Sequence, residues 1–352
     1  MDKNVIGIKD LVFSNFEDNY IETLLTILES LSAEQIFRTA DADGFEVIMQ
    51  GYDDFLAELT LDHHNLNIDK FVEQITVSQK RNINRHRQQF ENFVLLIELC
   101  KSIFEIVIDR ISKYKNDLSE TLKVAISLYG LILRKANQIF LLLMSGQEDA
   151  AMAVWRSLYE TTVVYLVLVT EDDEVLTKKF VEHSDIGRYK KAISYQENHK
   201  SFNFPPLEDD VILKYTRRRD ALKNKYGLDF VKSDYGWAND LFGHKTTFIM
   251  LESRLALEKF RPYYKFCSEY VHTNFASFFS FKEGNMINLY KFDEFNITRV
   301  SIVDPMQYTA SLLDEVTDFI LWRFSMPKEL DANRFLIVRT FNRLVESLGE
   351  EE

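Results

Sequence analysis

Turn-forming residues are scarce in this sequence, which contains only eleven Gly and five Pro in 352 residues. A β-sandwich or barrel needs a turn about every ten residues, and such turns draw mainly on Gly and Pro. The scarcity therefore argues against an all-β protein and favours long helices. With 46% hydrophobic residues, a chain of this length can bury a large core, and its length corresponds to about two domains.

Other absences bear on where the protein works. The two cysteines, Cys100 and Cys267, make no disulfide framework in so long a chain, which favours a reducing compartment. Residues 1–10 lack the basic start and apolar block of a secretory signal. The longest apolar stretches, residues 131–144 and 161–170, are shorter than the roughly 18 to 20 residues that span a bilayer. We therefore predict a cytoplasmic protein that does not contact a membrane.

Positive charge is also in short supply, since the formal net charge is −13. A surface of this average sign repels polyanions, which excludes a general coat for DNA or RNA. Two basic runs depart from the average, residues 80–87 and residues 214–225, and either of them could contact RNA. The alternative for both runs is a solvated helix face.

The spacing of apolar residues predicts helices along most of the chain, because they recur at the three- and four-residue steps of one helix face. The predicted helices cover residues 16–31, 53–61, 66–113 as one helix or two broken near Arg81, 118–144, 148–170, 172–196, 207–226, 244–260, 262–281, 304–324 and 328–348. Alternation over residues 45–49 permits a short strand, and Gly284-Asn285 indicates a loop or hairpin.

The clearest pair of helices meets at Ser145-Gly146. Gly146 suits the left-handed position that ends a helix, and Glu148 and Asp149 then sit at the positive end of the next helix. We expect an antiparallel helical hairpin here, at the centre of the fold.

A polar run at residues 115–117 precedes this hairpin. It predicts an N-terminal helical region, residues 1–113, and a helical core domain, residues 114–352. The predicted fold class is all-α: a multi-helix bundle around the central hairpin, with room for a small irregular or β element near the N-terminus.

Several familiar site motifs are missing. The sequence has no Gly-rich phosphate loop, no paired Cys ligands and no Gly-x-Ser-x-Gly elbow, which removes most support for nucleotide-dependent enzymes and simple hydrolases. Glu269 and His272 form one Glu-x-x-His pair, whereas di-iron bundles use two such pairs with further glutamates. We therefore predict no metal and no bound cofactor.

Two groups of residues could carry chemistry. Arg156 and Glu160 lie four apart on an otherwise apolar helix, so they share a face, and burying them would require a network of partners. Tyr264, Ser268 and His272 are also spaced four apart on a predicted helix. His exchanges protons near neutral pH, and Ser and Tyr can orient it or hold a phosphate oxygen. For both groups the alternative is a structural role.

A third group lies inside the first basic run, where Arg81, Asn82 and His86 form an Arg-Asn-x-x-x-His pattern. Its spacing resembles the signature of HEPN ribonucleases, in which Arg and His from a helix, commonly doubled across a dimer, cleave RNA without metal. The surrounding helix is unusually polar for a bundle element, so a solvated face is again the alternative.

Two segments, residues 136–160 and 264–272, resemble an uncharacterised bacterial helical family, domain of unknown function 5677. Trp237 precedes the second segment, and the likeness spans a little under half of the chain. The resemblance implies an all-helical core in which Arg156 and Glu160 on one helix meet Ser268 and His272 on another. It supplies no reaction, and a looser architectural likeness to HEPN-type and abortive-infection proteins is a weak guide to function.

Two functions fit these residues. In the first, Arg156, Glu160, Ser268 and His272 line one pocket of a HEPN-like, metal-independent nuclease that acts on RNA in bacterial stress or phage defence. His272 is the general acid or base, Arg156 stabilises charge on phosphate, Glu160 fixes Arg156 and Ser268 orients His272, while residues 214–225 guide the RNA. In the second, the same residues form a structural network in a non-enzymatic helical module that binds a protein partner or a second copy.

Overall fold

The computed structural model describes residues 68–70, 72–113, 118–271, 281–282, 285–286, 302–323 and 328–349. The chain divides into two compact units, Met1–Glu73 and Gln74–Glu352. The described part is almost entirely helical, which confirms the predicted all-α class. The permitted strand at residues 45–49 and the helices predicted over residues 16–31 and 53–61 lie outside the described residues.

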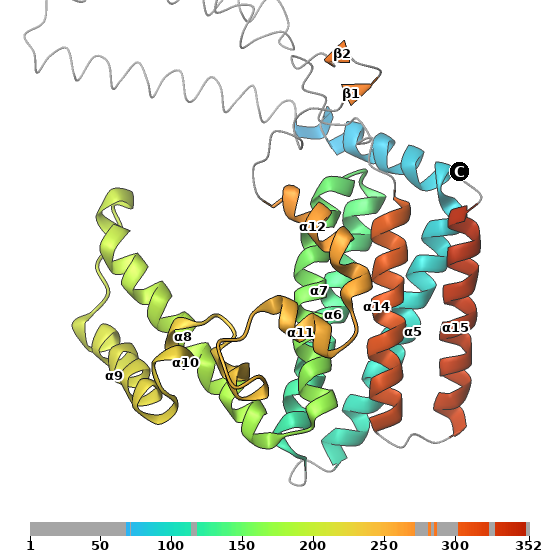
Figure 1. Ribbon diagram of the computed structural model, residues 1–352. Coiled ribbons are helices and arrows are strands. Elements are labelled where there is room, and N and C mark those ends of the chain that lie inside the picture. The colour runs from blue at the N-terminus through green and yellow to red at the C-terminus, as the bar shows by residue number, and fades with distance from the viewer. Residues whose placement is uncertain are drawn as a thin grey trace, which may run out of the picture. The chain divides into compact units, whose positions relative to one another are not determined.

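Long helices packed side by side form a bundle in the second unit (Figure 1). In the described residues this bundle consists of α5 (Arg87–Lys113), α6 (Glu120–Met144), α7 (Glu148–Glu171), α14 (Val303–Arg323) and α15 (Lys328–Gly349). Because α5 packs against both α6 and α15, the predicted division after residue 113 falls between helices of one compact unit.

The α6–α7 hairpin forms as predicted, with Gly146 in the left-handed conformation at φ 72°. The Gln147 N–H donates to the Leu142 carbonyl at 2.9 Å, and the Gly146 N–H donates to the Leu143 carbonyl at 3.0 Å. These two bonds satisfy carbonyls that the end of α6 would otherwise leave open. Ser119 caps the other end of α6, where its Oγ accepts from the Leu122 N–H at 3.2 Å.

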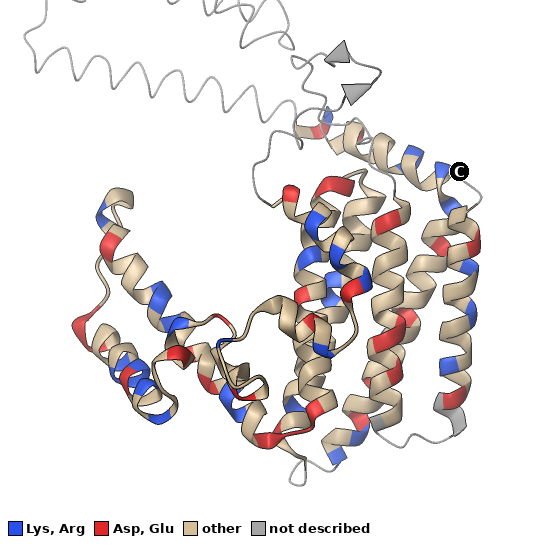
Figure 2. Ribbon diagram, in the orientation of Figure 1, with Lys and Arg blue, Asp and Glu red and all other residues tan. Residues whose placement is uncertain are grey.

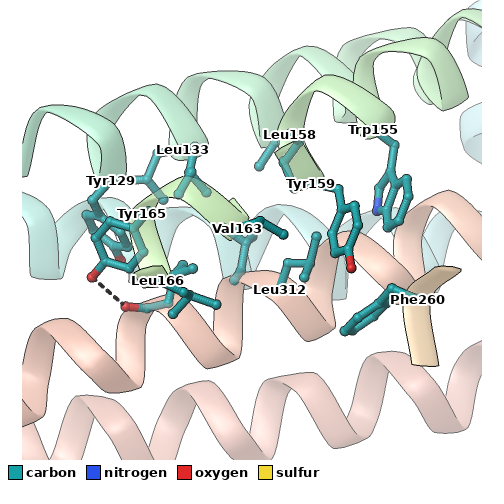
Figure 3. Packing of buried hydrophobic residues seen from close by; sticks show 14 of the residues in the cluster. Tyr129, Leu133, Trp155, Leu158, Tyr159, Val163, Tyr165, Leu166, Phe260 and Leu312 are labelled. Carbon is teal, nitrogen blue, oxygen red and sulfur yellow. Dashed lines mark hydrogen bonds between the residues drawn. The ribbon is translucent and has the colours of Figure 1, made fainter. Parts of the chain in front are cut away.

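Aromatic side chains fill the interior where α6, α7 and α14 face one another (Figure 3). Three buried tyrosines keep their hydroxyls satisfied there, as burial of a polar group requires. The Tyr165 hydroxyl donates to the Val316 carbonyl at 3.2 Å, and the Tyr129 hydroxyl lies 2.8 Å from Thr317 Oγ1. The Tyr159 ring stacks on Trp155 at a centroid distance of 5.3 Å.

An arm leaves the bundle after α7 and consists of α8 (Glu174–Asn198), η1 (His199–Phe202), α9 (Asp209–Tyr226), α10 (Leu228–Lys232) and η2 (Gly236–Leu241) (Figure 1). The chain then returns to α7 through α11 (Phe248–Arg254), η3 (Glu258–Phe260) and α12 (Arg261–Glu269). Asp173 caps α8, since its carboxylate accepts from the Val175 N–H at 2.7 Å.

Two predicted helices end earlier than expected. The helix predicted over residues 244–260 is the short α11 followed by η3, because Ala256 adopts a left-handed conformation at φ 54° and interrupts the helix. The helix predicted over residues 262–281 ends at Glu269, where Tyr270 and Val271 form a turn.

In two other segments the structure gives more detail than the sequence predicted. The helix predicted over residues 66–113 has a turn at His86, where α5 begins, and not at Arg81. The hairpin predicted around Gly284-Asn285 appears as two short antiparallel strands, β1 (Phe281–Lys282) and β2 (Asn285–Met286).

By length and composition alone, α6 and α7 are each apolar enough to cross a membrane. The uninterrupted apolar stretches in the sequence are shorter than these helices, and on α6 Arg134 and Lys135 interrupt the stretch over residues 131–144. Core helices of soluble proteins pass the same test, so the finding is weak evidence, and the absence of membrane contact remains a prediction.

Candidate functional site

The site begins with Arg156 and Glu160, which lie one turn apart on α7 as their spacing predicted. Arg156 Nε lies 3.2 Å from Glu160 Oε1. The two side chains are 21% and 38% exposed, so the pair sits at the edge of the core and remains in contact with solvent. Surface ion pairs contribute little to stability, but a pair that is partly buried must have its polar atoms satisfied.

Tyr264 of α12 completes this pair from a second helix. Its hydroxyl donates to Glu160 Oε1 at 2.6 Å, and the Arg156 Cζ lies 5.0 Å from the centre of its ring. Burial and the nearby Glu160 carboxylate raise the pKa of Tyr264 to about 12, so its hydroxyl stays protonated and acts as a donor. We call Arg156, Glu160 and Tyr264 the polar clamp, because they join α7 to α12.

Of the two other predicted site residues, Ser268 and His272, only Ser268 lies among the described residues. The Ser268 hydroxyl donates to the Tyr264 carbonyl of its own helix at 2.7 Å, which is a local bond within one helical turn. His272 lies outside the described residues, so its distance from Arg156 stays undetermined. The structure therefore joins Arg156 to Glu160 and places Ser268 on the helix that carries Tyr264.

A second polar group, which the sequence reasoning missed, lies beside the clamp. Glu252 of α11 is 1% exposed, and its carboxylate binds Arg261 Nη1 at 2.6 Å and the Tyr159 hydroxyl at 3.0 Å. Burial raises the pKa of Glu252, and its bonds to Tyr159 and Arg261 oppose that rise. Arg261 also lies over the Tyr264 ring, at 5.2 Å, so both groups share Tyr264.

Lys135 of α6 adds a cation that contacts α7. Its ammonium donates to the Ser157 carbonyl and Oγ, both at 2.8 Å, and to Thr161 Oγ1 at 2.6 Å. Burial lowers the pKa of Lys135, and the negative charge of Glu160 partly offsets this effect. No local pattern predicts this contact, since Lys135 is 22 residues from Ser157.

Most polar atoms of the site are thus directed at other protein groups. One exception is Arg156 Nη1, which is buried and has no hydrogen-bond partner among the described residues. A guanidinium with an open donor can bind a further acceptor such as a carboxylate or a phosphate oxygen. Within the described residues, no group of three or more His, Cys, Asp or Glu could hold a metal ion.

The Arg81, Asn82 and His86 pattern has a different environment. Asn82 is buried, and its amide donates to the Leu143 carbonyl at 2.7 Å, at the end of α6. His86 is also buried and meets Phe90 edge-to-face, whereas Arg81 is exposed. This geometry gives Asn82 a structural role, and the likeness to HEPN ribonucleases stays a prediction.

The basic run at residues 214–225 lies on α9, and half of its charges are neutralised within the arm. Arg218 pairs with Asp185 at 3.2 Å, Lys225 pairs with Glu182 at 3.0 Å, and Arg219 pairs with Asp220 at 3.1 Å. Its capacity to attract RNA is therefore smaller than the sequence suggests.

The polar clamp lies within the part of the chain that matches a family model. No curated protein and no solved structure matches the chain. Residues 122–286, which include the polar clamp, Ser268 and His272, match the model of the family of unknown function DUF5677, and this confirms the predicted family resemblance for that part of the chain.

Proposed function

We propose that this protein is a non-enzymatic, cytoplasmic helical binding module in which the polar clamp holds α12 on α7. The observation that carries the proposal is that Glu160 Oε1 accepts both from Arg156 Nε and from the Tyr264 hydroxyl. A carboxylate engaged by donors from two helices restricts their packing, and such networks can specify one arrangement of a core.

Neighbouring contacts support the same function. Glu252, Tyr159 and Arg261 form a second closed network between α7, α11 and α12. The Ser268 hydroxyl donates to the backbone carbonyl of Tyr264 and, among the described residues, forms no hydrogen bond with a side chain of the clamp. Polar side chains that satisfy one another in this way stabilise a fold without requiring a substrate.

Thermal unfolding of Arg156→Ala tests the proposal. We expect the melting temperature to fall by about 2 to 6 °C, because Glu160 loses a charged donor in a partly buried position. Arg188→Ala is the matched control, since the Arg188 side chain is 56% exposed and Asp185 keeps a second cation in Arg218, and it should change the melting temperature by about 1 °C or less. Equal melting temperatures for Arg156→Ala and the wild type would contradict a structural role for the clamp.

A second candidate is an RNA-directed, metal-independent nuclease of bacterial stress or phage defence. The buried Nη1 of Arg156, which has no hydrogen-bond partner among the described residues, favours it, because a phosphate oxygen that reached this atom would supply the acceptor that it lacks. In this function Arg156 stabilises the charge on phosphate, Glu160 holds Arg156, His272 is the general acid or base and Ser268 orients His272.

The His272→Ala variant separates the two functions when two assays are run together. The first is thermal unfolding, and the second is incubation with a mixed cellular RNA pool without added metal. Loss of RNA cleavage in a variant that melts like the wild type would support the nuclease. The binding module predicts that neither the wild type nor the variant cleaves RNA.

A further inference from the structure

A groove of about 1080 Å³ opens between α14, α15 and η3, away from the polar clamp. Its walls carry four carboxylates, from Asp314, Glu315, Asp318 and Asp331, against two cations, Lys259 and Arg334. Figure 2 shows the resulting run of acidic bands along α14. The groove is thus a concave surface with an excess of negative charge.

The negative charge of this groove is only partly compensated. Arg334 pairs with Asp318, but no ion pair reaches Asp314, Glu315 or Asp331 among the described residues. Burial and repulsion from Asp318 raise the pKa of Asp314, and burial also raises the pKa of Glu315. Carboxylates in this state gain stability when a cation from another molecule approaches them.

An exposed aromatic patch borders the acidic groove. Trp322 is 75% exposed and meets Phe319 edge-to-face at 5.7 Å, and Phe335 of α15 is 65% exposed. Exposed Trp and Phe beside a concave surface are typical of protein interfaces, where they act as anchors. The occupant of this groove should therefore carry both cations and an apolar side chain.

The arm carries a helix of that composition. Residues 174–226 contain twelve Lys and Arg against eight Asp and Glu, in a chain whose net charge is −13. On α9, Lys214 and Arg217 are exposed, no ion pair engages them among the described residues, and Leu213 beside them is 47% exposed. Leu222 and Arg219 face inward, where Arg219 lies over the Tyr189 ring of α8 at 4.7 Å. The outer face of α9 is thus basic, partly apolar and open.

The two complementary surfaces belong to opposite sides of the second unit. In Figure 1, α7 and α11 separate the arm from α14 and α15, so α9 cannot fill the groove of its own molecule. Figure 2 shows basic bands on α9 and acidic bands on α14. A helix lying in a groove is a common mode of recognition.

We propose that the acidic groove between α14 and α15 of one copy binds α9 of a second copy. Lys214 and Arg217 approach Glu315 and Asp331, and Leu213 packs against Trp322. The contact joins unlike surfaces, so each dimer keeps one free groove and one free α9 and can extend to a ring or a filament. The proposal rests on the proposed binding function, for which it names the partner, but not on the polar clamp.

Sedimentation of the full chain over a range of concentrations and at two salt concentrations tests this contact. We expect reversible self-association that weakens at high salt, because the facing charges are exposed. Glu315→Lys with Asp331→Lys reverses the charge of the groove, and Lys214→Glu with Arg217→Glu reverses the charge of α9. Either pair of substitutions should weaken association about a hundredfold through like-charge repulsion.

Mixing the two reversed variants gives the sharpest result. In the mixture, the unchanged α9 of the groove variant can meet the unchanged groove of the α9 variant, and the two reversed surfaces are complementary as well. The mixture should therefore associate, although neither variant does so alone. The variant with Lys191→Glu and Lys200→Glu is the matched control, because it makes the same change in net charge on the arm but leaves α9 intact. It should associate like the wild type.

The groove variant must fold for this comparison, since Glu315 is partly buried. If its circular dichroism shows unfolding, Trp322→Ala with Asp331→Lys replaces it, because both side chains are exposed. A wild type that stays monomeric at every concentration, or folded variants whose mixture does not associate, would overturn the proposal. Either result leaves the clamp test of melting temperatures unaffected, so the two proposals can fail separately.

Discussion

Glu160 accepts from donors on two helices, so the contribution of each donor can be measured separately. Tyr264→Phe removes the hydroxyl at 2.6 Å from Glu160 and keeps the ring that packs under Arg156. We expect the free energy of unfolding to fall by about 1 kcal/mol, because the bond involves a charged acceptor that is still partly solvated. Urea denaturation measures this change. Tyr195→Phe, which removes an exposed hydroxyl bond to the Pro205 carbonyl, should cost clearly less.

Glu252 allows a test in which pH matters. Arg261→Ala leaves a buried carboxylate without its cation, so we expect a loss of about 3 kcal/mol at pH 7. The pKa of Glu252 is raised in the folded state, so the folded protein binds this proton more tightly than the unfolded chain does. The difference between variant and wild type should therefore shrink as the pH falls from 7 through that raised pKa, since a neutral carboxyl needs no cation.

Denaturant unfolding at several pH values measures this difference. Arg254→Ala serves as its control, because Arg254 pairs with Glu171 in a more exposed position on the same short helix. Its effect should stay below about 1 kcal/mol. A penalty for Arg261→Ala that does not change with pH would mean that Glu252 does not carry the charge.

Helical elements depend on a few polar contacts at their ends. The Asn82 side chain donates to the Leu143 carbonyl and ties the helix before α5 to the end of α6. Asn82→Ala should lower the free energy of unfolding by about 2 kcal/mol, because the Leu143 carbonyl keeps only its backbone donor and a buried side chain is truncated. Asn84→Ala, at an exposed position where the side chain accepts from Arg87, should change it by about 0.5 kcal/mol or less. Guanidinium denaturation compares the two variants. Equal effects would contradict a stabilising role for the hydrogen bond from Asn82 to the Leu143 carbonyl.

Predicted and observed elements agree best where the helical spacing of apolar residues continues over many residues. The helices α6, α7, α8, α9, α14 and α15 begin and end within a few residues of the predicted bounds, because each presents a sustained apolar face or a clear cap. The segment from α11 to α12 was predicted less well. There Ala256 takes a left-handed conformation that favours Gly or Asn, and contacts of the adjoining residues, such as the bond from the Tyr159 hydroxyl to the Leu257 carbonyl, override local preference.

The reactivity of the two cysteines measures how readily the core of the whole molecule opens. Cys100 and Cys267 are both buried, and burial raises the pKa of each thiol to about 12. Thiolate is the reactive form, so both thiols should react with iodoacetamide far more slowly in the native protein than in denaturant. Mass spectrometry of the alkylated protein follows each site. Fast labelling of either cysteine under native conditions would show that its part of the core opens without global unfolding.

The sequence by itself determined the all-helical class, the central α6–α7 hairpin and the pairing of Arg156 with Glu160, because periodicity, a C-terminal Gly and i,i+4 spacing are local properties of the chain. It also placed Tyr264 one helical turn before Ser268. Only the tertiary structure decided that Tyr264 reaches Glu160, that Glu252 meets Tyr159, and that four carboxylates of α14 and α15 line one groove. These contacts join residues far apart in the chain, and the packing of whole helices, which no local pattern encodes, sets which of their faces meet.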